Sequence, residues 1–139
     1  MSKKRNRLIH FAYKSIGKPY EYGARHYEAP RKFDCSSFVQ YLYKRIGFEI
    51  PRSALKQAAK GREVDLTKED LKIGDLLFFK GSIGHYDKNF PIGIGHVVIY
   101  IGNKKIIHAS GEEGRVLEEP VDKFLKREDL VVTKRILKN

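Results

Sequence analysis

One cysteine and two histidines stand where they can carry out nucleophilic chemistry. Cys35 follows Asp34, a residue type that favours the N-cap, and is therefore predicted in the first turn of a helix. The partial positive charge at a helix N-terminus favours the thiolate, which is the nucleophilic form. His96 and His108 lie in or beside apolar stretches, where a polar ring needs a hydrogen-bond partner. Together they supply the nucleophile, the base and the orienting group that a cysteine hydrolase requires.

The same three side chains leave two other interpretations open. One thiolate and two imidazoles can hold a zinc ion with an open coordination position. Alternatively, Cys35 is a small buried core residue and both histidines are core residues with satisfied hydrogen bonds. The position of Cys35 at a helix start favours the nucleophile, so we predict a site without a metal ion or another cofactor.

The elements that must position these residues are predicted from the spacing of apolar side chains. In chain order they are helices over 5–16, 35–45 and 53–59, strands over 76–79, 96–101 and 105–109, a helical turn over 120–126 and a strand over 130–137. Because helices come first and neighbouring strands later, this order predicts an α+β fold with an antiparallel sheet.

The hairpin between the two histidine strands decides whether the rings can meet. Gly102-Asn103 is a turn signal. Because side chains alternate between faces, a regular two-residue turn there would put His108 on the face opposite His96. A three-residue turn would pair Val98 with His108 and restore a common face, and a bulge would do the same. We therefore predict an odd loop or a bulge if His108 orients His96.

Composition limits the class of protein. The 139 residues are 41% hydrophobic and 32% charged, which predicts one globular domain over 1–139. The single cysteine excludes an internal disulfide. The net charge of +11 favours anionic partners, but the basic residues are scattered, so no nucleic-acid interface is expected. No apolar run is long enough to cross a bilayer, and no signal peptide is visible after the basic start.

Six short motifs, in one order, resemble the NlpC family of papain-like bacterial cell-wall cysteine peptidases. They are GKPYEYG (17–23), FDCSSFV (33–39), PRS (51–53) with Gln57, GDLLFF (74–79), GHVVIYIG (95–102) and IHAS (107–110). Each motif is weak alone, but six in the same order are specific. The resemblance implies a papain-like fold in which the nucleophile begins a helix that packs on an antiparallel sheet.

The resemblance also implies roles for individual residues. Cys35 takes the place of the nucleophile, His96 that of the base and His108 that of the polar residue that holds the imidazole. Tyr20 falls where the family has a tyrosine beside the catalytic cysteine, and it would help the backbone N–H of Cys35 to form an oxyanion hole. The positions that in relatives acting on muropeptides help to bind the polar ends of the substrate are Asp34, Ser36 and Ser53.

The implied reaction is hydrolysis of a peptide bond in peptidoglycan stem peptides, commonly between D-glutamyl and a diamino acid, through an acyl-enzyme. The expected partner is peptidoglycan or a muropeptide. The location stays open between cell-wall material and cytosolic muropeptides. Two other functions remain open: a lipid or acyl-transfer enzyme of the same superfamily, and a non-catalytic cationic binding module in which Cys35 is buried.

The segment from Lys80 to Gly95 is longer than is usual for the family. It carries His85, Tyr86 and Phe90 amid four glycines and leads directly to the predicted base. We therefore expect it to form one wall of the cleft. The alternative is a disordered surface insertion.

Overall fold

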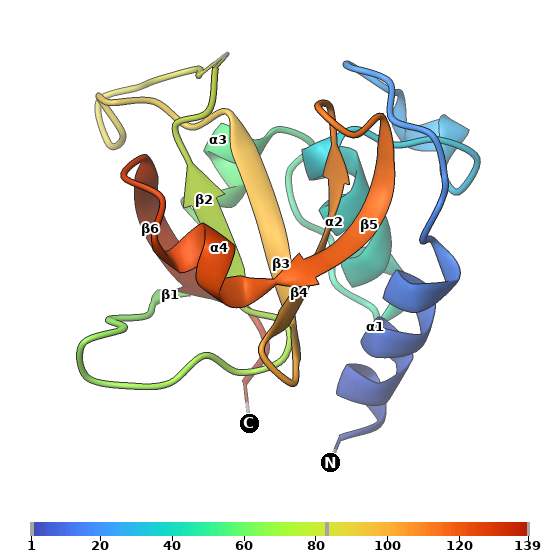
Figure 1. Cartoon of the computed structure of the whole chain (residues 1–139), viewed down its shortest axis with the longest axis horizontal. Helices are drawn as coiled ribbons and strands as arrows, with labels where there is room; N and C mark the ends of the chain where they lie inside the picture. Colours follow the sequence, from blue (N-terminus) through green and yellow to red (C-terminus); the bar gives the residue numbers. More distant parts are fainter. Residues whose placement is uncertain (1, 83, 139) are drawn as a thin grey trace.

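A six-stranded antiparallel sheet forms the centre of the fold, and helices cover both of its faces (Figure 1). The computed structural model describes residues 2–82 and 84–138. Its elements are α1 (Lys3–Lys14), the 3-10 turn η1 (His26–Glu28), α2 (Cys35–Arg45), α3 (Ala54–Gln57), β1 (Arg62–Glu63), β2 (Leu76–Phe79), β3 (His96–Gly102), β4 (Lys105–Ser110), β5 (Arg115–Pro120), α4 (Val121–Leu125) and β6 (Leu130–Arg135). The strand order is β1-β6-β2-β3-β4-β5. The predicted α+β class with an antiparallel sheet is confirmed.

Side-chain hydrogen bonds fix where the helices begin. Asp34 Oδ1 accepts the N–H of Ser37 at 2.8 Å, and Ser37 Oγ accepts the N–H of Asp34 at 2.9 Å. This reciprocal cap starts α2 at the predicted residue. Ser53 caps α3, which lies within the helix predicted over 53–59. The first helix begins two residues earlier than the apolar pattern indicated, because Ser2 caps it by accepting the N–H of Arg5.

The alternation of side chains along the strands creates two apolar layers. On one face of β3, Val97 and Ile99 are in the core cluster that includes α1 and α2. On the other face, Val98 packs with Phe124 of α4 in a smaller cluster. In Figure 1 the blue and cyan helices α1 and α2 lie together at one side of the molecule, with β6 and β1 at the other.

The hairpin between β3 and β4 contains the bulge that a shared histidine face requires. Ile99 pairs with Ile107, but Gly102 pairs with Lys105, so the register shifts by one residue between Tyr100 and Gly102. If the pairing of Ile99 with Ile107 is continued by one residue toward the start of β3, Val98 lies opposite His108. The turn itself lies at Asn103 and Lys104, whose φ angles are 52° and 62°. The expected turn at Gly102-Asn103 is therefore wrong by one residue.

Two strands were not predicted from the sequence. The strand β5 has two glutamates and ends in a proline, so it lacks a clear apolar alternation, yet it pairs with β4 along its whole length. The short β1 is exposed and pairs with β6. Within 2–82 and 84–138, no helix combines the length and the apolar character needed to cross a membrane.

A buried ion pair joins the loop before β2 to the end of β6. Arg135 donates from Nε to Asp75 Oδ1 at 2.9 Å and from Nη2 to Asp75 Oδ2 at 2.8 Å. Asp75 is fully buried and Arg135 is 8% exposed. The remaining guanidinium donors bind Glu69 and the carbonyl of Asp70. Through these hydrogen bonds, Arg135 links the end of β6 to Asp75 and to the segment that contains Glu69 and Asp70.

Candidate active site

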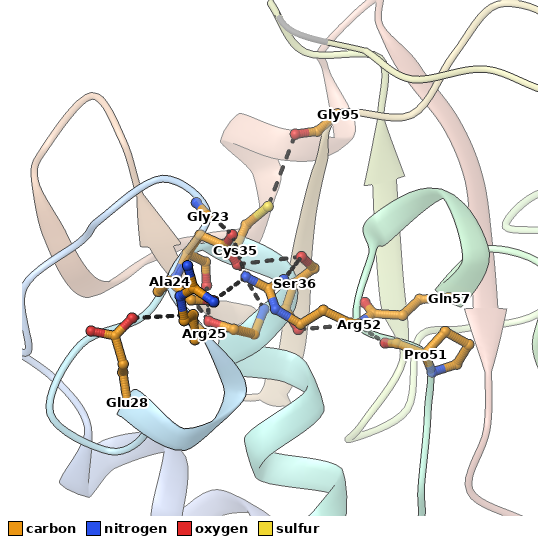
Figure 2. A network of polar contacts seen from close by, with 12 residues as sticks. Gly23, Ala24, Arg25, Glu28, Cys35, Ser36, Pro51, Arg52, Gln57 and Gly95 are labelled. Carbon is orange, nitrogen blue, oxygen red and sulfur yellow. Dashed lines mark hydrogen bonds and ion pairs between the residues drawn. The ribbon is translucent and has the colours of Figure 1, made fainter.

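Cys35 is the first residue of α2 and is 8% exposed. Its thiol donates to the carbonyl oxygen of Gly95 at 3.9 Å, which Figure 2 shows as the sulfur pointing toward the residue before His96. Burial, assisted by the charge of Asp34, raises the pKa of the Cys35 thiol to about 11, and the N–H groups of Val97 and Ser36 act in the opposite sense. The thiol is therefore protonated at neutral pH. The sequence predicted that the helix N-terminus would favour the thiolate. In the free protein, the loss of solvation raises the pKa of the thiol by more than the helix N-terminus lowers it.

His96 and His108 form a directly hydrogen-bonded pair. Nε2 of His96 lies 2.9 Å from Nδ1 of His108. Nε2 of His108 lies 2.6 Å from Oε2 of Glu119, a residue of β5. The ring of Phe124 packs edge-on against His108 with 5.0 Å between centroids. The bulge thus brings the two predicted histidines together, on the face of the sheet that α4 covers.

Both rings are neutral at neutral pH. Burial, together with the neighbouring His108 and Arg127, lowers the pKa of His96 to about 3, and Asp129 opposes this shift. Burial lowers the pKa of His108 as well, and the hydrogen bond to Glu119 opposes it. A neutral imidazole is the form that can accept a proton, so His96 has the protonation state of a general base.

These lowered values predict a loss of stability in mild acid. The folded protein binds fewer protons at His96 and His108 than the unfolded chain, whose histidines titrate near 6.5. Stability that is present above this pH is therefore lost as the pH falls, by at most about 1.4 kcal/mol per pH unit for each histidine. Urea unfolding should show this loss between about pH 6.5 and 5, above the usual range of carboxylates. The loss should be smaller in His96→Gln, and an identical slope in that variant would contradict the prediction.

A cleft of about 490 Å³ opens beside the histidine pair. Its lining includes Tyr20, Tyr22, Gly81, Ser82, Gly95, His96, His108, Ser110, Gly111, Glu112, Glu113, Glu119, Lys123, Phe124 and Arg127. Burial, with the charges of Cys35 and Asp34, raises the pKa of Tyr20 to about 12, so its phenol keeps its proton and can donate. A Cβ at Gly111 would lie 3.2 Å from the Tyr20 ring, so this glycine permits the close approach that holds the tyrosine.

The segment from Lys80 to Gly95 contributes to the cleft through its two ends. Gly81, Ser82 and Gly95 line the cleft. The middle of the segment folds back on itself, since His85 and Ile94 exchange backbone hydrogen bonds. Tyr86 is 74% exposed, and Phe90 packs against the main core. The ends thus form a wall as expected, while the aromatic residues in the middle point elsewhere.

Asp34 and Ser36 belong to a polar cluster that Arg52 completes. Figure 2 shows the Arg52 side chain reaching Ser36 within this cluster. Oδ2 of Asp34 accepts from Arg52 Nη2 at 2.7 Å and from the N–H of Gly23 at 3.1 Å. Its Oδ1 accepts from the N–H of Ser37 at 2.8 Å and from Ser36 Oγ at 3.3 Å. The carboxylate has four donors and therefore little remaining capacity to accept from a substrate.

The structure does not bring Ser53 into the cleft. Ser53 is exposed, and its hydroxyl accepts the N–H of Lys56 at 3.3 Å, so its contact is the cap of α3. Sequence analysis missed Arg52 and Glu119. Arg52 lies in the PRS motif, but the motif assigns it no role, and Glu119 gives no signal because its strand lacks a clear apolar pattern.

The zinc site that the sequence left open and a second cavity of the protein are both relevant to where the reaction takes place. Within the described ranges, no three His, Cys, Asp or Glu side chains are grouped as metal ligands would be. A larger cavity of about 850 Å³, with residues of α1, η1 and α2 in its lining, contains none of the predicted site residues. The smaller cleft is lined by Tyr20, His96 and His108, and Cys35 is connected to it through the hydrogen bond to Gly95.

Comparison with known proteins gives consistent matches. The sequence profile of the NlpC/P60 family matches residues 17–135. The peptidoglycan endopeptidase RipB of Mycobacterium tuberculosis is 33% identical over 126 residues, covering 84% of this chain and 47% of RipB. The probable endopeptidase NlpC homolog of Haemophilus influenzae is 34% identical over 113 residues, covering 81% of this chain and 52% of that protein. An NlpC/P60 family protein from Bacillus cereus superposes with a TM-score of 0.78 and 31% identity, over 96% of this chain and 40% of that one. The chain spans about half the length of the two relatives matched by sequence.

Proposed function

Because this chain belongs to the NlpC/P60 family, we propose that it is a cysteine peptidase that hydrolyses stem peptides of bacterial peptidoglycan. The proposed scissile bond joins D-glutamyl to a diamino acid, as the resemblance implies, and residues 1–139 act as one catalytic domain. The observation that carries the proposal is the hydrogen bond of 2.9 Å between His96 and His108. The thiol of Cys35, which begins α2, bonds to the carbonyl of Gly95, the residue before His96. The endopeptidase names of the relatives support the same activity.

In the proposed reaction, the thiol of Cys35 leaves the Gly95 carbonyl and gives its proton to Nδ1 of His96, the ring nitrogen that does not face His108. The sulfur attacks the carbonyl carbon, and the imidazolium then protonates the leaving amine. Water, activated by His96, hydrolyses the acyl-enzyme. Because burial keeps the resting pair as thiol and imidazole, the proton moves when the substrate is attacked and not before.

The proposed oxyanion hole combines a helix end with a phenol. The first N–H groups of a helix have no partner within the helix, so the N–H of Cys35 is suited to bind the developing charge. Tyr20, whose phenol stays protonated and whose ring lies against Gly111, supplies the second donor.

For the polar ends of the substrate, we place the contact at the cluster of Asp34, Ser36 and Arg52. Of the paired charges in this cluster, the Arg52 side chain is 34% exposed, whereas that of Asp34 is 10% exposed. The guanidinium is therefore the more accessible of the two and can bind a substrate carboxylate. For Ser53, the third position implied by the resemblance, a substrate contact through the hydroxyl would compete with the cap of α3.

Digestion of purified peptidoglycan tests the proposed activity and bond. We expect soluble fragments whose masses correspond to cleavage after D-glutamyl, with intact disaccharides and a new amino group on the diamino acid. Mass spectrometry of the fragments identifies the bond, and Cys35→Ala protein is the control for contaminating hydrolases. Fragments cut within the glycan, or fragments released equally by the control, would contradict the proposal.

A further inference from the structure

Glu119 is the next member of the chain of hydrogen bonds behind the histidine pair. It lies on β5, where it pairs with Ile106, while His108 pairs with Leu117. Residues 108 and 119 are therefore diagonal neighbours on the same face of the sheet. Oε2 of Glu119 is 2.6 Å from Nε2 of His108, and its Oε1 accepts from Lys123 Nζ, also at 2.6 Å. Lys123 lies in α4, which begins immediately after β5.

The chemistry of a carboxylate fixes the proton on each ring. Burial alone would raise the pKa of Glu119, but the hydrogen bonds from Lys123 and His108 bring it below its ordinary value. An ionised carboxylate can only accept, so Nε2 of neutral His108 must carry the proton. Nδ1 of His108 then has only a lone pair, and Nε2 of His96 must donate to it. This leaves Nδ1 of His96 as the basic nitrogen.

We propose that Glu119 is a positioning residue that sets the tautomers of His108 and His96, so that His96 presents an unprotonated Nδ1 to the thiol of Cys35. This role rests on the proposed peptidase function and adds to the implied Cys–His–His set a residue that acts on the base through His108. Without an acceptor at Glu119, His108 can carry its proton on Nδ1. His96 would then accept at Nε2 and hold its proton on Nδ1, where it cannot act as a base.

The charged groups around His96 and His108 are consistent with an ionised carboxylate at Glu119. Lys123 and Arg127 are the cations that act on His108, and Arg127 and Asp129 act on His96. Asp129 accepts hydrogen bonds of 2.7 and 2.8 Å from Arg127 and one of 3.0 Å from the N–H of Gly81, so both of its oxygens are already bound. Lys123 is bound to Glu119 itself. The carboxylate in direct contact with the relay is therefore that of Glu119.

Nuclear magnetic resonance of protein labelled with ¹⁵N-histidine tests the tautomers without any substrate. In the wild type, both His96 and His108 should show the proton on Nε2. In Glu119→Leu, which removes the acceptor, a substantial population of the Nδ1–H form should appear on both rings. In Glu119→Gln, whose carbonyl can still accept, the Nε2–H form should persist in larger part. A wild-type protein with the proton on Nδ1 of His108, or a Glu119→Leu variant with unchanged tautomers, would overturn the proposal.

Kinetics on peptidoglycan fragments tests whether the substitution lowers kcat and leaves KM nearly unchanged. We expect kcat to fall by about 100-fold or more in Glu119→Leu, with KM changed by less than about threefold, and an intermediate kcat in Glu119→Gln. Glu118→Gln is the matched control, because Glu118 is the adjacent residue on β5 and bonds to Tyr13 of α1. It should keep kcat within about twofold of wild type.

The two measurements separate this inference from the proposed function. If Glu119→Leu does not fold, Glu119→Ala removes the same acceptor with a smaller side chain, and tautomers and kcat in Glu119→Ala equal to those of Glu118→Gln would reject the role. If the wild type shows the expected tautomers but does not cleave peptidoglycan, the proposed substrate fails and the positioning role stands.

Discussion

Replacing Cys35 with alanine should abolish peptidoglycan hydrolysis, with a loss in kcat/KM of at least about 1,000-fold, because no other nucleophile can form the acyl-enzyme. The fold should survive. The cap of α2 is built from Asp34 and Ser37, so it does not depend on the sulfur, and alanine is the best helix former. Release of fragments from purified peptidoglycan measures the activity, and circular dichroism with thermal unfolding checks the fold.

His96→Ala should cause a comparable loss, because the buried thiol would have no base to take its proton. His10→Ala is the matched control, since His10 is an exposed residue of α1, and it should keep wild-type activity. Activity of Cys35→Ala close to wild type would remove Cys35 as the nucleophile. Full activity of His96→Ala would leave the cysteine in place but require another base.

Arg135→Met should destabilise the protein by about 3–5 kcal/mol, the cost typical of breaking a buried ion pair. The reason is the partner that remains: Asp75 is fully buried, and without the guanidinium its charge is left with the backbone N–H of Lys72. This is a large share of the stability of a domain of ordinary size. Urea unfolding followed by circular dichroism measures the free energy of unfolding.

Arg62→Met is the matched control for this prediction. Arg62 also bonds to Glu69, but its side chain is 56% exposed, so its loss should cost no more than about 1 kcal/mol. In the double variant Arg135→Met with Asp75→Asn, much of the stability should return, because the unpaired charge is gone. Equal effects of the two arginine substitutions would mean that burial of the Arg135 pair does not matter.

The start of α2 could be predicted because its causes are local. Asp34 caps the helix, and the apolar spacing from Phe38 onward gives its length, so sequence alone placed Cys35 at its first residue. The strands β2, β3 and β4 were also predictable, since each is a short apolar or β-branched run. The alternation of side chains along the hairpin predicted an odd loop or a bulge if His108 orients His96. The structure has a bulge between Tyr100 and Gly102.

What could not be predicted depends on contacts between distant segments. The strand β5 is defined by its pairing with β4 and not by its own composition, so Glu119 had no visible connection with His108. The saturation of Asp34 arises because Gly23 and Arg52, from two separate segments, both reach it. The protonation of the thiol likewise follows from burial beneath other segments, whereas the sequence displayed only the helix end.

The protonated, buried state of Cys35 has a consequence for the durability of the protein. Peroxide and disulfides react with thiolates, and the reaction also requires access to the sulfur. A thiol with a pKa of about 11 and 8% exposure is therefore a poor target for oxidants while no substrate is bound. Because residues 1–139 hold one cysteine, they offer no second thiol that could trap a sulfenic acid as an internal disulfide before further oxidation. Keeping the sulfur as a thiol between turnovers thus protects a nucleophile that has no resolving cysteine within residues 1–139.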